Sequence, residues 1–250
     1  MKLFLSSAEA SNDFRFEALQ NNNNKYYLYS YYNLRGKKKL LDYLKVKGEV
    51  FIDSGAHTLQ KPGKEVDWDK FVDEYIKFIN DYKQHLDYIV ELDVENKIGL
   101  PLVEKYRNKI KKETSIEPMV VWHRGRGFDY LKYMCKTYKY IGFSGFVEDK
   151  TGEEEVPERF INVFCDMAHK QNTKVHGFGY TRQNLPEKRF DSADSSSWLM
   201  GVRFGKLDYF NGRNMTKHSD LKNYKLKYKF INKWNAKEWV KYQQFLDKIR

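Results

Sequence analysis

Residues that can do chemistry follow six short apolar runs of this 250-residue sequence. Carboxylates, imidazoles and small hydroxyl residues end the runs, in chain order, at Asp53-Ser54-Gly55, Asp93, His123-Arg124, Ser144-Gly145, His176-Gly177 and Asp194. If the runs are parallel strands of a barrel, their carboxyl ends converge on one face, where active sites of that fold lie. Two carboxylates on such a face, one nucleophilic and one that handles protons, are the usual equipment for cleaving a glycosidic bond.

The carboxylates also have ordinary structural explanations. Asp53 could cap a helix or form a turn. Asp93 lies in "ELDVE", where Glu91 or Glu95 could be the important acid and all three could form structural salt bridges. Asp194 lies in the serine-rich stretch "FDSADSSSWLMG", where it could bond neighbouring backbone amides. We interpret this stretch as the end of a buried strand that presents Asp194 beside small serines.

The histidines leave two further possibilities open. His123 and His176 could be core histidines with satisfied hydrogen bonds. Hard carboxylates together with histidine suit zinc, iron or manganese. Spacing alone therefore leaves open a metal site built from Asp53, Asp93, His123 and His176. The sequence has no Cys-x-x-Cys pair, so a structural zinc site of the usual kind is not expected.

The elements that would position these residues alternate along the chain. Short apolar runs predict strands, and the longer segments between them show helical spacing. Eight strands are expected at "KLFLS", "YYLYSYY", "EVFIDSG", "YIVELD", "PMVVWHR", "YIGFSGF", "KVHGFG" and "FDSADSS". Apolar strands that alternate with helices favour parallel pairing and predict an α/β fold, a (β/α)8 TIM barrel. An open doubly wound sheet would need a Gly-rich phosphate turn after the first strand, and "KLFLSSAEA" has none.

The barrel is expected to occupy residues 1–205 of a single domain. Amphipathic helices are predicted within it at 67–82, 101–112, 128–138 and 157–170. Residues 206–250 are predicted to form a basic, aromatic extension that packs on the barrel. Its end, "NAKEWVKYQQFLDKIR", is expected to be a closing helix that Asn235 caps, with Glu238 in the capping-box position.

The composition indicates a globular protein with a polyanionic partner. Lys and Arg number 45 against 34 Asp and Glu, a formal net charge of +11, which favours nucleic acid, although a lysine-rich proteome would also produce this excess. Cys135 and Cys165 fall in apolar helical patterns and are expected to be core thiols of a reducing compartment. No apolar run is long enough for a membrane span or, in "MKLFLSSAEA", for a signal peptide, so we expect a cytoplasmic protein without a membrane partner.

Six motifs resemble, in the same order, those of the tRNA-guanine transglycosylase family. "FIDSGAHTLQ" resembles its D-S-G-G-F-Q motif, "YIVELDVE" its strand ending in F-D-E, and "VVWHRG" stands where the family has V-Q-G-G. "YIGFSGF" is similar to its I-G-G-L, "KVHGFGYT" to its L-M-G-V-G-T, and "SADSSSW" stands where it has M-F-D-C. The resemblance covers about residues 1–205 and is closest to the phage and bacterial branch that inserts 7-deazaguanines into DNA. A phage-encoded member would act in the host cytoplasm.

The resemblance implies an enzyme that exchanges guanine for a 7-deazaguanine co-substrate without cutting the backbone and without a cofactor. Asp194 would be the nucleophile that attacks the sugar C1′, and Asp53 the general acid/base for the leaving and entering bases. Asp93 would accept hydrogen bonds from the guanine N1–H and exocyclic amine. The other residues expected to bind the base are Ser54, His123, Gly145, Phe146 and His176. His123 stands where the family has glutamine, but a histidine can still donate to a base carbonyl.

The chain departs from the tRNA enzymes in one region. Their Cys/His zinc subdomain has no counterpart after residue 205, which favours DNA over tRNA as the partner. A target base in duplex DNA must then be flipped out or met single-stranded. The residues expected to hold phosphates, each of which could equally be solvated surface, are Arg124, Arg126, Arg182, Arg203, Arg213 and Lys217.

Three other interpretations stay open at this point. The same pocket could belong to a DNA glycosylase that hydrolyses out a modified base. The same barrel end could carry a metal-dependent hydrolase, or the chain could be a non-enzymatic nucleic-acid binder. A homodimer also stays open.

Overall fold

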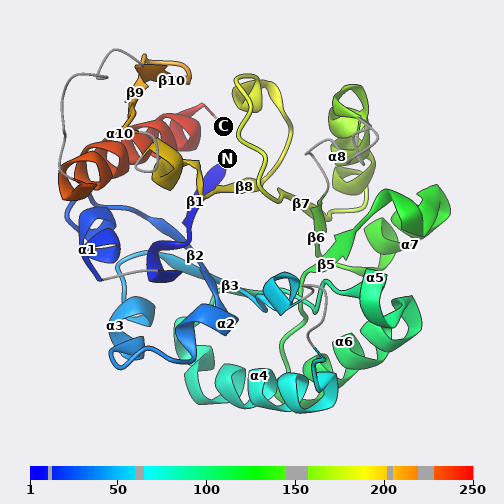
Figure 1. Ribbon diagram of the computed structural model, residues 1–250. Helices are drawn as coiled ribbons and strands as arrows, with labels where there is room; N and C mark the ends of the chain where they lie inside the picture. The colour runs from blue at the N-terminus through cyan, green and yellow to red at the C-terminus, as the bar shows by residue number, and fades with distance from the viewer. Residues whose placement is uncertain (11–12, 60–64, 145–156, 202–204, 219–227, 250) are drawn as a thin grey trace.

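The computed structural model describes residues 1–10, 13–59, 65–144, 157–201, 205–218 and 228–249. Within these residues, eight parallel strands form one sheet in the order β4-β3-β2-β1-β8-β7-β6-β5. The strands are β1 (Lys2–Ser6), β2 (Tyr26–Ser30), β3 (Glu49–Asp53), β4 (Tyr88–Ile89), β5 (Val120–Trp122), β6 (Tyr140–Phe143), β7 (Lys174–Gly177) and β8 (Ser192–Ser195). Figure 1 shows that the sheet curls around a centre and that helices cover its outside. The predicted α/β class and a TIM-like arrangement are therefore confirmed, whereas the predicted (β/α)8 barrel is not closed among these residues.

The two edge strands of the sheet, β4 and β5, meet in one place. A single parallel bridge joins Val90 to Met119, and Glu91 N donates to Met119 O at 3.0 Å. Strand β4 is only two residues long, and the chain turns away after it because Val94 N bonds to Leu92 O. The sheet is therefore curled and TIM-like, without the continuous β4–β5 ladder that a closed barrel would have among these residues.

The helices pack around the sheet in chain order. They are α1 (Phe14–Gln20), α2 (Tyr31–Leu34), α3 (Leu40–Leu44), α4 (Trp68–Tyr82), α5 (Glu95–Ile98), α6 (Leu100–Thr114), α7 (Gly127–Thr137), α8 (Ile161–His169) and α10 (Tyr228–Lys248). The four predicted amphipathic segments are confirmed as α4, α6, α7 and α8. Helix α8 begins later than its pattern predicts because a 3-10 turn, η5 (Glu158–Phe160), precedes it. Cys135 in α7 and Cys165 in α8 are buried, as expected.

The closing helix α10 begins earlier than predicted. It starts at Tyr228, so Asn235 lies inside the helix and caps nothing. The Asn235 side chain is fully buried, where it accepts from Asp208 N at 2.9 Å and donates to Trp198 O at 3.2 Å. Buried Glu238 accepts from Phe210 N at 3.0 Å. The two polar residues thus bind the backbone of the hairpin β9 (Leu207–Phe210) and β10 (Met215–His218) and of the turn after β8, instead of forming a capping box.

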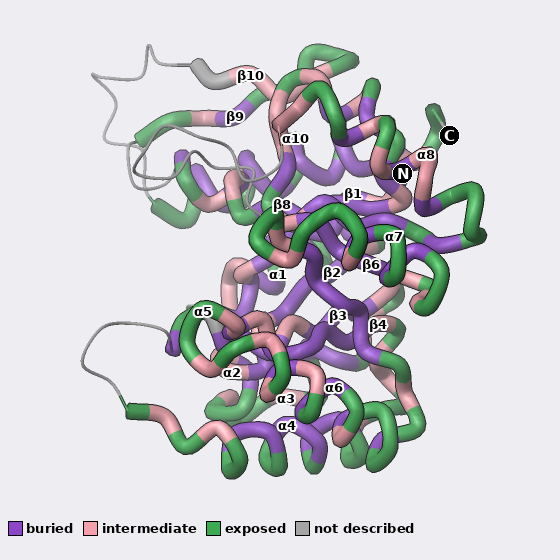
Figure 2. The backbone as a smooth tube through the Cα atoms, turned by 90° about the vertical axis from the view of Figure 1, so that its right-hand side faces the viewer, coloured by how far each residue is buried: buried purple, intermediate pink, exposed green. Residues whose placement is uncertain are grey.

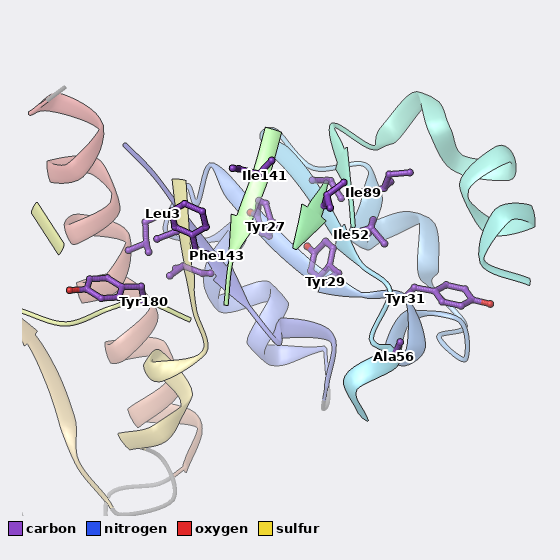
Figure 3. Packing of buried hydrophobic residues seen from close by; sticks show 14 of the residues in the cluster. Leu3, Tyr27, Tyr29, Tyr31, Ile52, Ala56, Ile89, Ile141, Phe143 and Tyr180 are labelled. Atoms are coloured by element: carbon purple, nitrogen blue, oxygen red, sulfur yellow. The ribbon is translucent and has the colours of Figure 1, made fainter. Parts of the chain in front are cut away.

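The sheet has an inner and an outer apolar layer, because side chains alternate between its faces. The larger cluster lies between the sheet and the helices and includes Tyr27, Tyr29 and Ile52 (Figure 3). The smaller cluster fills the inside of the curl with Phe4, Leu28, Phe51, Val90, Met119 and Val121. The strands are buried, whereas exposed residues gather on the outer helices (Figure 2). The inner face is thus apolar at mid-height and polar at the strand ends.

Candidate functional site

A cavity opens at the carboxyl ends of strands β3 to β7. Its volume is about 240 Å³, and it is lined by Asp53, Val90, Asp93, Val121, Ser144 and Phe178. Ligand sites are typically roughly 300–1,000 Å³, so this cavity suits a ligand smaller than a drug molecule, such as a single base. Three of the predicted polar strand ends therefore do meet at one cavity.

Asp53 is presented by a tight turn after β3. Gly55 N donates to Asp53 Oδ1 at 3.2 Å, and Gly55 has a φ of +71°. A Cβ at Gly55 would stand 2.1 Å from Ser30 Oγ, so this turn requires glycine. Ser54 is buried, and its Oγ accepts from Ala56 N at 3.4 Å at the start of the 3-10 helix η2 (Ala56–Leu59). Ser54, predicted to line the base pocket, is not a lining residue of the cavity and shapes this turn.

Asp53 has an acidic neighbour that the strand-end pattern misses. Glu9, in the 3-10 helix η1 (Ala8–Ala10), is buried, and its Oε1 accepts from Ser30 N at 3.0 Å. Ser30 is the register partner of Asp53 across β2 and β3. Burial raises the pKa of Glu9, and the charge of Asp53 raises it further. A second, buried carboxyl group therefore lies beside the turn that presents Asp53.

Asp93 and His123 form a pair at the edge of the cavity. His123 Nε2 lies 2.6 Å from Asp93 Oδ1, and the two side chains are 15% and 25% exposed. Because Asp93 accepts at Nε2, the other ring nitrogen of His123 can donate only when the imidazole is protonated. The pair therefore links the protonation of His123 to any donation from this side chain to a base carbonyl.

Asp194 lies inside the curl, on β8. It stands level with Phe4 of β1, and its side chain is 13% exposed. Its Oδ1 accepts from Gly179 N at 2.7 Å and lies 3.4 Å from His176 Nε2. Asp194 is not a lining residue of the cavity, but it reaches the cavity's neighbourhood because Gly179 directly follows the lining residue Phe178. Asp53 and Asp194 are thus on strands separated by β2 and β1 in the same curled sheet.

His176 lies beneath the cavity and does not line it. It is fully buried, and its ring stacks edge-on against Phe178 and Phe51 at centroid distances of 4.4 Å and 5.0 Å. Its polar partners are Ser192 and Asp194. The structure thus places His176, which was predicted to bind the base, in the core and not among the lining residues of the cavity. Its contacts are with the carboxylate.

The three acids of "ELDVE" have separate roles. Glu91 is fully buried on the outer face, where its Oε2 lies 2.6 Å from Arg107 Nε and its Oε1 accepts from Val121 N at 2.8 Å. Burial raises the pKa of Glu91 despite these partners. Glu95 bonds to Arg126, and only Asp93 reaches the cavity. Strand alternation places neighbours at positions 91 and 93 on one face in a regular strand, but the chain turns after Glu91.

The predicted phosphate-binding residues divide in the structure. Arg126 is wrong as a phosphate contact, because its side chain is 1% exposed and is held by Glu95 and Glu91. Arg124 is exposed, Arg182 pairs with Glu158 at 2.9 Å, and Arg213 pairs with Glu187 at 2.7 Å while staying 67% exposed. Gly145, Phe146, Arg203 and the side chain of Lys217 lie outside the described part of the chain.

The aromatic residues near the site have different positions. Trp198 is core, since it is fully buried and its Nε1 donates to Ser6 O at 2.9 Å. Phe143 is likewise fully buried in the outer cluster. Phe178 alone of these three lines the cavity. A wall for a flat ligand therefore comes from the loop after β7.

The described residues hold no group of three or more His, Cys, Asp or Glu side chains arranged to bind a metal ion. Asp93 and His123 pair with each other, while His176 pairs with Asp194. The residues considered for a metal site, Asp53, Asp93, His123 and His176, therefore do not form one cluster. In the same part of the chain, no helix combines the length and the apolar character that crossing a membrane requires.

Comparison with known proteins identifies no family. No protein-family model matches the chain, and no curated protein matches it.

Proposed function

We propose that this chain is a base-exchanging transglycosylase that replaces guanine in DNA with a 7-deazaguanine through a covalent Asp194–sugar intermediate. The observation that carries the proposal is the pair of carboxylates in different surroundings at one end of the curled sheet. Asp194 is buried and held on one oxygen by Gly179 N, as a fixed nucleophile needs to be. Asp53 lies half-buried at the cavity, where a proton donor could reach a bound base. The ordered motif resemblance supports the same assignment.

The chemistry balances with these two groups. An Asp194 oxygen attacks the sugar C1′ as the C1′–N9 bond breaks, and the bonding pair leaves with guanine, which takes a proton from Asp53. The entering base then gives its N9 proton to Asp53 and attacks C1′. The C1′–oxygen pair returns to the Asp194 carboxylate. Both carboxyl groups end as they began, and no backbone bond is cut.

The cavity supports binding of a single flat base. Asp93 offers a carboxylate to the N1–H and exocyclic amine of guanine, and Ser144 offers a hydroxyl from β6. The cavity wall at Phe178 is aromatic, and aromatic rings stack on bases at a gain of about 1–3 kcal/mol each. The apolar residues Val90 and Val121 line the floor. Water exclusion, which the covalent intermediate needs, would come from these surfaces.

We favour DNA as the partner because the net charge is +11 and residues 206–250 contain no cysteine that could belong to a Cys/His zinc site. The flipped base would enter the cavity while Arg124 and Arg213, both exposed, hold the backbone.

The test is base exchange on DNA with a labelled 7-deazaguanine. Wild-type protein should incorporate label and form a denaturant-stable protein–DNA complex. Asp194→Asn should lose both, because an amide is a poor nucleophile. Asp191→Asn is the matched control, since Asp191 directly precedes β8 and binds His169 and Val175 N instead of facing the site. Abasic sites without incorporated label would show that the protein hydrolyses the base out instead of exchanging it. Unchanged activity in Asp194→Asn would show that Asp194 is not the nucleophile.

A further inference from the structure

A chain of four polar side chains runs through the inside of the curled sheet and ends at Asp194. The Tyr140 hydroxyl bonds to Ser192 Oγ, and Ser192 Oγ lies 2.5 Å from His176 Nδ1. His176 Nε2 then faces Asp194 Oδ1 at 3.4 Å. Ser192 and His176 are fully buried. None of these contacts is needed to build the strands, because all three are side chain to side chain.

One assignment of the protons gives every polar side chain of this network a hydrogen-bond partner. Burial raises the pKa of Tyr140, so its hydroxyl keeps its proton. The Asp194 carboxylate can only accept, and His176 Nε2 must therefore carry a hydrogen to bond to it. A neutral His176 then accepts at Nδ1 from the Ser192 hydroxyl, whose oxygen accepts from Tyr140. In this arrangement every polar group of the chain has a partner and no buried charge is added beside the carboxylate.

The two oxygens of Asp194 are consequently unlike. Oδ1 faces two donors, Gly179 N at 2.7 Å and His176 Nε2 at 3.4 Å. Among the described residues, Oδ2 accepts no hydrogen bond. A carboxylate oxygen whose lone pairs are held by donors is the poorer nucleophile, so the open oxygen is the one that can attack.

We propose that His176, fixed as its Nε2–H tautomer by Ser192 and Tyr140, is a positioning residue that occupies Oδ1 of Asp194 and leaves Oδ2 to attack the sugar. This inference rests on the proposed function. Oδ2 forms the bond to C1′ as the C1′–N9 pair leaves with the base, and Oδ1 becomes the ester carbonyl, which still accepts from both donors. No proton moves along the chain. Since hydrogen bonds to a charged acceptor are stronger than to a neutral one, His176 favours the free carboxylate and so promotes release of the intermediate.

The first test determines the tautomer of His176 and needs no substrate. Imidazole ¹⁵N NMR of the folded protein should show a protonated Nε2 and an unprotonated Nδ1 for His176. Ser192→Ala should shift the Nδ1 resonance and leave that of His169, which pairs with Asp191 on the surface at 2.9 Å, unchanged. An Nδ1–H tautomer, or a His176 Nδ1 resonance that does not shift in Ser192→Ala, would overturn the proposal.

The second test uses two variants that distinguish the hydrogen-bond donor at Nε2 of His176 from the space that its side chain fills. In His176→Gln the amide nitrogen can replace Nε2, whereas in His176→Asn the shorter side chain reaches Ser192 and cannot reach Asp194. We expect single-turnover exchange on DNA to stay within about threefold of wild type in the glutamine variant. It should fall about tenfold in the asparagine variant, the loss of one charge-assisted hydrogen bond, with a larger share of protein trapped as the covalent complex. His169→Asn is the matched control and should match wild type.

The outcomes separate this inference from the proposed function. Equal loss in the glutamine and asparagine variants, or wild-type rates in both, would mean that His176 only fills space. If wild-type protein forms no covalent complex with DNA, the proposed function fails and the positioning role fails with it. The His176 tautomer measured by NMR would still show whether the hydrogen bonds from Tyr140 to Asp194 are arranged as described. Thermal unfolding of each variant shows whether the fold is kept.

Discussion

Replacing Arg107 by methionine should leave the buried carboxylate of Glu91 without its ion-pair partner and destabilise the fold. Arg107 in α6 is 4% exposed at its side chain, and its partner Glu91 is fully buried. Methionine keeps most of the apolar stem of arginine and removes the guanidinium. Arg107 also donates to Tyr138 Oη at 2.8 Å, so a second, partly buried group loses its donor.

The expected loss follows from the partners that remain. Breaking a buried ion pair by removing one partner costs about 3–5 kcal/mol. Glu91 Oε1 keeps the Val121 N donor and lies 3.4 Å from an Arg126 nitrogen, so we expect the low end, about 3 kcal/mol. Lys109→Met on the same helix is the matched control. The Lys109–Asp73 pair is 32% and 60% exposed, and such pairs contribute less than about 1 kcal/mol.

The loss should also depend on pH in one direction. Burial raises the pKa of Glu91 above its ordinary value, so the folded state binds this proton more tightly than the unfolded state. The free energy of unfolding therefore falls as pH rises from the unfolded pKa, about 4.3, through the folded pKa. Removing Arg107 disfavours the charged form and raises the folded pKa further. The deficit of Arg107→Met should be smaller at pH 5 than at pH 8.

Urea unfolding of the two variants and the wild type at both pH values measures these quantities. Equal losses in Arg107→Met and Lys109→Met would refute the argument from burial. If Arg107→Met loses the same free energy of unfolding at pH 5 and at pH 8, the loss does not come from the charged form of Glu91.

Four further substitutions test other parts of the structure. A Cβ at Gly142 would stand 2.3 Å from the Phe178 ring, so Gly142→Ala should push this ring toward the cavity and raise the KM for the free base, with a stability cost of about 1–3 kcal/mol in urea unfolding. Asn235→Ala should lower the free energy of unfolding by about 2–3 kcal/mol, because two buried backbone groups lose their partner. Arg124→Ala should lower the salt dependence of DNA binding by about one counterion and leave the free energy of unfolding unchanged. Arg126→Ala should lower the free energy of unfolding, because its buried ion pairs with Glu95 and Glu91 are lost. A destabilised Arg124→Ala variant together with an Arg126→Ala variant of wild-type stability would contradict their assigned positions.

Local patterns explain why much of the fold could be predicted. Helix α4 has a continuous apolar stripe and the Asp67 cap, which bonds Lys70 N at 3.0 Å, and both are properties of the residues themselves. The strands follow from short apolar runs that end in polar residues. Both signals depend on neighbours within a few positions, so no tertiary information is needed to find them.

Residue roles that depend on partners from distant elements could not be predicted in this way. Asn235 has the side chain of a cap and serves as a buried link, because α10 extends past it to Tyr228. Arg126 has the sequence context of a surface loop, yet Glu95 and Glu91 enclose it. In each case the same side chain is compatible with two surroundings, and packing chooses between them.

The sequence by itself determined that polar residues end the strands of an α/β sheet, since strand periodicity and polar ends are written within each segment. Only the tertiary structure decided which of those residues meet. It brings Asp53, Asp93 and Ser144 to one cavity and places His176 under Asp194. The physical reason is that curl and register set which strand ends face each other, and these arise from contacts between residues far apart in the chain.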